Sequence, residues 1–177
     1  MTINRVEPFT YFFQTDGHTV PNNPNLPVLI YNQVLIPETD SLADLFEETF
    51  TQNGWSGCWR WGVYDFQHFH CNAHEALGIA QGQAEIQLGG PQGDSFQVKA
   101  GDLVVLPAGT GHRNLGCTND FLVVGAYPAG QGRYETNRGD PAEFLKAVQR
   151  IIETPLPTMD PIYGKNGPLI ELWEIKP

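Results

Sequence analysis

The sequence predicts an all-β fold, a double-sheet sandwich or barrel, with two α-helices outside it. Between Trp55 and Tyr127, short strand-like runs alternate with glycine-rich turns, which is the pattern of such folds. The 19 glycines and 14 prolines make the chain turn-rich without reaching the level that signals disorder. The 177 residues lie in the normal range for one domain and contain no internal repeat, so we expect a single barrel.

Before this region we expect strands at residues 11–13 and 28–35, and then one helix. Apolar residues at positions 42, 45, 46 and 50 have the spacing of one helix face, which predicts a helix over Ser41–Phe50. Asp40 precedes this stretch and is the expected N-cap.

After the region of strands, the sequence predicts a second helix and a last strand. Asp140 can cap a helix, Pro141 suits its first position, and Glu143 lies near its positive end. We expect a last strand over Pro168–Trp173. The predicted apolar face of the second helix consists of Phe144, Leu145, Val148, Ile151 and Ile152.

Four of the five histidines lie in two short blocks, residues 62–82 and 101–112. His68 and His70 are two residues apart, so on an extended segment they project to the same side. Glu75 follows at an odd separation, and the polar stretch at residues 71–74 indicates a bend that restores its orientation. In the second block, a turn over residues 107–111 presents His112. Three imidazoles and one carboxylate suit one divalent ion of iron, manganese, nickel, copper or zinc.

The two blocks fit the spacings GX5HXHX4EX6G and GX5PXGX2H at every fixed position, and in this the chain resembles the cupin superfamily. One departure is Gly116, where the second cupin block usually has asparagine. Beyond the blocks, most of the chain resembles the single-domain cupins of the bacterial YjlB-like family. The segments that carry this wider resemblance are Leu26–Leu29, His74–Gly78, Leu88–Pro91, Val123–Pro128 and Asp160–Lys165.

The resemblance implies a double-stranded β-helix, or jelly roll, with a core over about 55–128, an N-terminal strand and helix extension over 1–54, and a C-terminal helix and tail over 129–177. It implies one divalent metal ion per chain, bound by His68, His70, Glu75 and His112. Cupins include dioxygenases, decarboxylases, isomerases, sugar sensors and storage proteins, so the fold alone does not choose a reaction. We expect a metal-dependent oxidoreductase of the dioxygenase type acting on a small molecule. The alternatives are a cupin-type isomerase or decarboxylase, or a non-catalytic protein that binds a metal or small ligand.

The alternation of side chains between the two faces of a strand also indicates which residues surround the metal. Tyr64 and Phe66 share the side of His68, and Leu77 and Ile86 face inward, so the expected pocket is mostly apolar. His74 is adjacent to Glu75, and we expect it at the mouth of the site or behind a ligand; it replaces Glu75 as a ligand if Glu75 points outward. If side chains alternate without interruption back from His68, Trp59 and Trp61 lie on the side opposite His68 and His70. We therefore expect them between the sheets or at a subunit interface.

The formal net charge of −10 argues against nucleic acids and anionic membrane surfaces as partners. The first residues do not resemble a signal peptide, and no apolar run is long enough to span a membrane, so we expect a cytoplasmic protein. In that compartment Cys58, Cys71 and Cys117 are expected to be reduced thiols. The resemblance implies a homodimer, because cupins often pair through exchanged or added strands that cover an exposed sheet edge.

Overall fold

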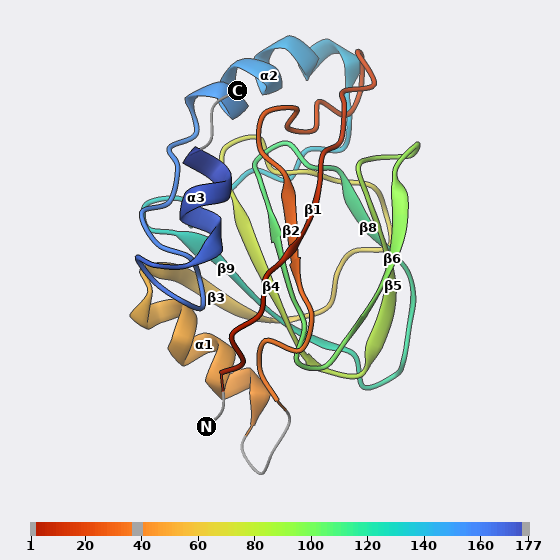
Figure 1. Cartoon of the computed structure of the whole chain (residues 1–177). Helices are drawn as coiled ribbons and strands as arrows, with labels where there is room; N and C mark the ends of the chain where they lie inside the picture. The colour runs from red at the N-terminus through yellow and green to blue at the C-terminus, as the bar shows by residue number, and fades with distance from the viewer. Residues whose placement is uncertain (1–2, 37–40, 175–177) are drawn as a thin grey trace.

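The computed structural model describes residues 3–36 and 41–174, and it shows two antiparallel sheets packed face to face, which is the cupin jelly roll (Figure 1). The larger sheet has the order β1-β2-β7-β4-β9-β3. Its strands are β1 (Phe9–Tyr11), β2 (Val28–Tyr31), β7 (Leu103–Leu106), β4 (Glu75–Gln81), β9 (Leu122–Pro128) and β3 (Trp55–Trp61). The smaller sheet has the order β6-β5-β8, formed by β6 (Asp94–Lys99), β5 (Gln83–Leu88) and β8 (His112–Cys117). The predicted all-β fold is therefore confirmed.

The inner strands of the larger sheet are covered on both faces, and β7 illustrates this: all four of its residues are buried. Val104 and Leu106 point into the core between the two sheets, where they join Ile79 of β4 and Ile86 of β5. Leu103 and Val105, which alternate with them, belong to a second core on the other face. Helices α1 (Leu42–Gln52) and α3 (Pro168–Glu174) lie over this second face (Figure 1). The uninterrupted apolar run of β7 is thus typical of a strand covered on both sides.

Helix α1 forms where the sequence predicted it and packs closely on the sheet. Phe46 and Phe50 are fully buried, and a Cβ atom at Gly78 of β4 would lie only 2.5 Å from the Phe46 ring. Glycine at this position therefore lets the helix approach the strand. The hydroxyl of Ser41 accepts a hydrogen bond from the Asp44 N–H and caps the helix. The expected cap, Asp40, lies outside the described residues.

The C-terminal segment corrects the predicted number of helices. The segment expected as a last strand is helix α3, whose Leu169 and Trp173 are four residues apart and both buried. The Trp173 indole donates to the Pro27 carbonyl, and the Leu169 N–H donates to the buried carboxylate of Asp160. Short apolar runs fit a strand or a buried helix equally well, so contacts with the rest of the protein decide between them.

The other predicted helix begins as expected but buries only part of the predicted face. Asp140 accepts a hydrogen bond from the Ala142 N–H, and a 3₁₀ turn, η1 (Pro141–Glu143), leads into α2 (Phe144–Glu153). The predicted face is right for Ile151, which is buried, and wrong for Leu145 and Ile152, which are 80% and 69% exposed. The helix packs through Ala147 and Ile151 against a small cluster formed by Val20, Phe69, Cys71 and Ala108.

No helix in the described part of the chain has the length and apolar character needed to cross a membrane. The three cysteines are unpaired in the structure.

Candidate metal centre

Backbone hydrogen bonds bring the two histidine blocks together at one end of the sandwich. The His68 N–H donates to the His112 carbonyl and the His112 N–H donates to the His68 carbonyl, at 3.2 and 2.9 Å. This pairing brings the centres of the two imidazole rings to 4.0 Å. The Gly109 N–H donates to the His70 carbonyl, from a turn in which Gly109 has a φ of 94°, a conformation that favours glycine. The two blocks therefore form one local structure.

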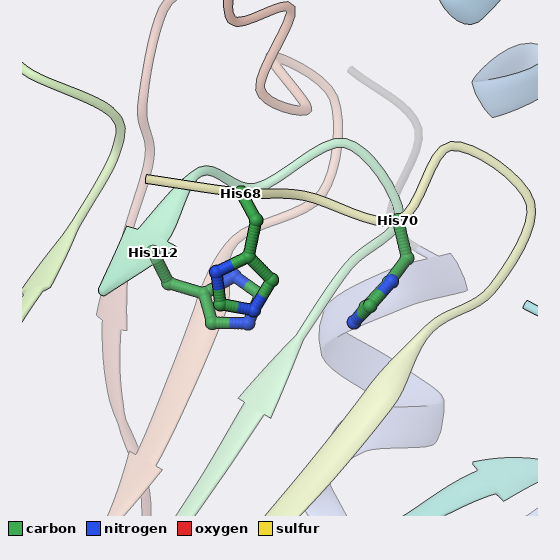
Figure 2. A group of neighbouring side chains, drawn as sticks. All are labelled: His68, His70 and His112. Carbon is green, nitrogen blue, oxygen red and sulfur yellow. The ribbon is translucent and has the colours of Figure 1, made fainter. Parts of the chain in front are cut away.

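The three histidine rings point toward a common position from these segments (Figure 2). His68, His70 and His112 are all buried, and each offers one donor atom within 4.8 Å of the others. His68 and His70 project to the same side because they are two residues apart on an extended segment, and His112 is the first residue of β8. A buried triad of this kind suits a metal ion.

Each imidazole is held in one tautomer by a backbone carbonyl. The Nδ1 atoms of the three histidines lie 3.0, 2.8 and 2.9 Å from carbonyl oxygens, for His68, His70 and His112 respectively. A carbonyl oxygen can only accept, so each Nδ1 carries the hydrogen and each neutral ring keeps its lone pair on Nε2. Ring orientation of this kind is typical of metal ligands. The three carbonyls belong to Phe66, Glu135 and Thr110.

The Glu75 carboxylate lies beside two of the three histidines, His70 and His112. The bend at residues 71–74 brings it to the start of β4 on the cavity side, with Oε2 3.4 Å from His70 Nε2 and 3.3 Å from His112 Nε2. The other oxygen, Oε1, accepts a hydrogen bond of 2.9 Å from the hydroxyl of Tyr127. Oε2 is buried and has no hydrogen-bond partner among the described residues. One carboxylate oxygen is thus held by the protein, and the other is left facing the imidazoles.

The electrostatics of the four side chains are strongly coupled. Burial would raise the pKa of Glu75, but the imidazoles of His70 and His112 outweigh burial and hold this pKa well below its usual range. Burial would likewise lower the pKa of His70, but the Glu75 carboxylate raises it. Burial and the neighbouring His112 lower the pKa of His68 to about 3. A carboxylate oxygen and an imidazole lone pair this close repel each other unless a proton or a metal ion lies between them, so the donor set fits a cation.

A cavity of about 210 Å³ lies against these donors and has mostly aromatic walls. Tyr64 and Leu77 line it, as do Trp59 and Trp61. Phe66 packs against His68 with ring centres 5.6 Å apart but is not one of the lining residues, and Ile86 lies in the core between the sheets. The remaining lining residues are Gly62, Val63, Tyr127 and Tyr134, with the four donors themselves.

The prediction that Trp59 and Trp61 lie on the side opposite His68 and His70 is wrong, because both side chains line the cavity. Trp59 does pack against the core between the sheets, as one of the alternatives expected. The chain between β3 and His68 is not a strand, so alternation does not extend across it. Trp59 lies across Gly125 of the neighbouring strand, where a Cβ atom would come within 2.0 Å of the indole. Glycine in β9 thus makes the space that Trp59 occupies.

Sequence reasoning also missed Tyr127 and Tyr134. Tyr127 lies on β9, and its hydroxyl accepts a hydrogen bond from the Trp59 indole while donating to Glu75. Tyr134 comes from the loop after β9, stacks on Tyr127 with ring centres 4.3 Å apart, and packs edge-on against His70 at 4.7 Å. Tyr127 could have been found from the sequence, because a tyrosine in a predicted buried strand brings a hydroxyl that needs a hydrogen-bond partner inside the protein. No local pattern marked Tyr134, because its loop reaches the site only through tertiary contacts.

His74 has a structural position away from the cavity. Its Nδ1 accepts a hydrogen bond of 2.9 Å from the Ala108 N–H, and its ring lies 4.8 Å from the Trp173 ring. It therefore joins the turn of the second histidine block to helix α3. Complete burial lowers the pKa of His74 to about 3 from the ordinary value of 6.5.

This burial predicts a pH-dependent stability. As the pH falls below about 6.5, the unfolded chain binds a proton on His74 while the folded chain does not, so His74 destabilises the fold progressively down to about pH 3. Between pH 7 and pH 5, protonation of His74 in the unfolded chain lowers the free energy of unfolding by about 2 kcal/mol. Denaturant unfolding of metal-free protein should show this loss in the wild type and a correspondingly smaller loss in His74→Asn, which retains an acceptor for the Ala108 N–H. Equal losses in the two proteins would contradict the assignment.

Comparison with known proteins gives one extensive match. No protein-family model matches the chain. The chain is 42% identical over 164 residues to "Uncharacterized protein YjlB" of Bacillus subtilis (strain 168), which covers 93% of this chain and 95% of that protein.

Similar solved structures have low sequence identity. Acireductone dioxygenase from Bacillus anthracis, with a cadmium ion in its active centre, is 13% identical with a TM-score of 0.41, covering 59% of this chain and 79% of that chain. A double-stranded β-helix protein from Klebsiella pneumoniae is 15% identical with a TM-score of 0.36, covering 79% and 85% respectively. The identity to YjlB over nearly the whole of both proteins shows that this chain belongs to the YjlB family of cupins.

Proposed function

We propose that the chain binds one divalent metal ion through the Nε2 atoms of His68, His70 and His112 and the Oε2 atom of Glu75. One observation carries this proposal: three imidazoles converge in one buried place, and a carboxylate oxygen without a hydrogen-bond partner among the described residues lies within 3.4 Å of two of them. The histidines need no change of tautomer to bind, because backbone carbonyls already hold the hydrogen on Nδ1 and leave Nε2 free.

We further propose that the protein is a metal-dependent oxidoreductase of the dioxygenase type that acts on a small molecule. An ion with these four protein ligands supplies Lewis-acid polarisation of an oxygen donor and, when it is iron, electron exchange with dioxygen. The protein contributes a cavity with largely apolar walls that holds the substrate beside the ion.

The composition of the cavity favours oxygen chemistry, or binding without catalysis, over isomerisation. An isomerase needs a positioned acid or base in addition to the metal ligands. Besides the four donors, the titratable side chains among the described lining residues are Tyr64, Tyr127 and Tyr134. Burial and the nearby Glu75 carboxylate raise the pKa of Tyr127 far above its usual range, so it does not release a proton near neutral pH. His74, the remaining buried histidine, does not line the cavity.

The first prediction concerns metal content. Wild-type protein reconstituted with iron or zinc should hold one ion per chain, and His70→Ala should hold much less, because the variant lacks one of the three imidazoles. His18→Ala, which removes an exposed histidine remote from the donors, is the matched control. Elemental analysis after gel filtration measures the stoichiometry. Equal content in the wild type and His70→Ala would contradict the ligand assignment.

A second prediction concerns Tyr127, which holds Glu75 Oε1 and leaves Oε2 free for the ion. Removing such a supporting hydroxyl typically lowers metal affinity 10–100-fold, and we expect about this loss for Tyr127→Phe. Competition with a chromophoric chelator measures the affinity. Tyr163→Phe is the control, because it removes a part-buried hydroxyl that contacts only the backbone of Asn4 and Val6. Unchanged affinity in Tyr127→Phe would show that the hydroxyl does not support the ligand.

The third prediction asks whether the protein is an enzyme. The anaerobically prepared Fe(II) form should consume dioxygen only with a suitable substrate from a panel of small phenols, thiols, diketones and sugars, followed with an oxygen electrode. Glu75→Gln should lose this activity more severely than Tyr64→Phe, because it removes the anionic donor. A metal-loaded protein that is inert across this panel, and in parallel isomerase and decarboxylase assays, would indicate a non-catalytic metal or small-ligand binding protein.

A further inference from the structure

We infer that the cavity takes a compound with a single aromatic ring, which binds the metal through an oxygen donor of its own. This inference rests on the metal site proposed above and specifies the class of compound that reaches it. It follows from three properties of the cavity: the arrangement of its aromatic side chains, the absence of lysine and arginine from its described lining residues, and its size.

One group of aromatic rings borders the cavity at His68. The Tyr64 ring packs edge-on against the His68 ring with centres 5.1 Å apart, and Trp61 packs edge-on against Tyr64 at 5.4 Å. Both side chains are substantially exposed, Trp61 at 62% and Tyr64 at 39%, although each lines the cavity. Large apolar side chains left exposed beside a buried polar site mark a place where an apolar ligand binds.

A second group borders the cavity at His70. Tyr127 and Tyr134 stack on each other, Tyr134 packs against His70, and the Trp59 indole is hydrogen-bonded to Tyr127. Tyr134 is 38% exposed, so it extends from the buried tyrosine toward solvent. An entering ligand therefore has aromatic faces or edges beside both histidines, and offset or edge-to-face contacts with these rings favour an aromatic ligand over a saturated one.

The same walls offer little to a polar ligand. Among the described lining residues, Glu75 has the only carboxylate, and none is lysine or arginine. The Tyr127 hydroxyl is already used by Glu75 and Trp59. The Tyr64 and Tyr134 hydroxyls and the Trp61 indole N–H are the polar groups left for a ligand, fewer than the hydroxyl groups of a sugar, each of which costs free energy when it is buried without a partner. An aromatic ring brings apolar surface and needs only one donor group directed at the metal.

The size of the cavity limits the ligand to about one ring. Its volume is about 210 Å³. An apolar cavity of about 150 Å³ in another protein accommodates benzene, whereas sites for drug-sized ligands have roughly 300–1,000 Å³. The space suits a ring with a short metal-binding substituent.

The test compares three probes that share one chelating group. Benzohydroxamate, cyclohexanecarbohydroxamate and acetohydroxamate bind a metal through the same two oxygens and differ only in the attached group. Titration calorimetry with the zinc-loaded protein should show benzohydroxamate binding about tenfold more tightly than the cyclohexyl compound, with acetohydroxamate weakest; tenfold corresponds to a small number of aromatic contacts. Zinc content is measured before and after each titration.

Variants of the cavity show whether its aromatic side chains cause the difference in affinity, or whether the probes differ in their own affinity for zinc. We call the ratio of the affinity for benzohydroxamate to that for the cyclohexyl compound the aromatic preference. In Trp61→Leu and Tyr64→Leu this ratio should fall to threefold or less, while the zinc content stays at one ion per chain. Phe9→Leu is the matched control, since Phe9 is an exposed aromatic residue on β1, at the opposite edge of the same sheet from β3, and it should retain the full preference. One zinc per chain with no aromatic preference in the wild type, or an unchanged preference in both wall variants, would overturn this inference and leave the metal site intact. A wild-type protein that binds no zinc would overturn the proposed function and this inference together.

Discussion

The placement of one carboxylate oxygen beside imidazole nitrogens is the constraint on which the rest of the structure depends. Glu75 Oε2 lies within 3.4 Å of two Nε2 atoms, buried and without a hydrogen-bond partner among the described residues. This arrangement is unfavourable unless a positive charge balances it. The backbone pairing of His68 with His112, the bend before Glu75 and the start of β4 all serve to hold these atoms together.

A surrounding layer of contacts makes the arrangement rigid. Three carbonyls orient the imidazoles, and the Tyr127 hydroxyl orients the carboxylate. The carbonyl for His70 belongs to Glu135, in the loop that also carries Tyr134 to the cavity. That loop is fastened to the first histidine block by reciprocal backbone hydrogen bonds between Phe69 and Asn137. Supporting contacts of this kind keep donor atoms within the narrow tolerances that metal binding requires.

Sequence patterns predicted which polar side chains lie together better than they predicted the walls of the cavity. His68, His70 and His112 converge, with Glu75 beside two of them, because short-range rules, namely alternation and a turn, govern each block. Those rules do not extend through the irregular chain between Trp61 and His68, so the indoles of Trp59 and Trp61 were assigned to the wrong side. Tyr134 and helix α3 depend on contacts between segments far apart in the chain, as in the hydrogen bond from Trp173 to Pro27. Local pattern carries no information about such contacts.

The central claim is that three imidazoles and one carboxylate bind a single divalent ion, and X-ray absorption spectroscopy of the zinc-loaded protein tests it most directly. The account predicts three imidazole nitrogens and at least one oxygen at about 2.0–2.2 Å from the zinc, with no sulfur. A zinc–sulfur distance of about 2.3 Å, or a spectrum that fits fewer than two imidazoles, would contradict it.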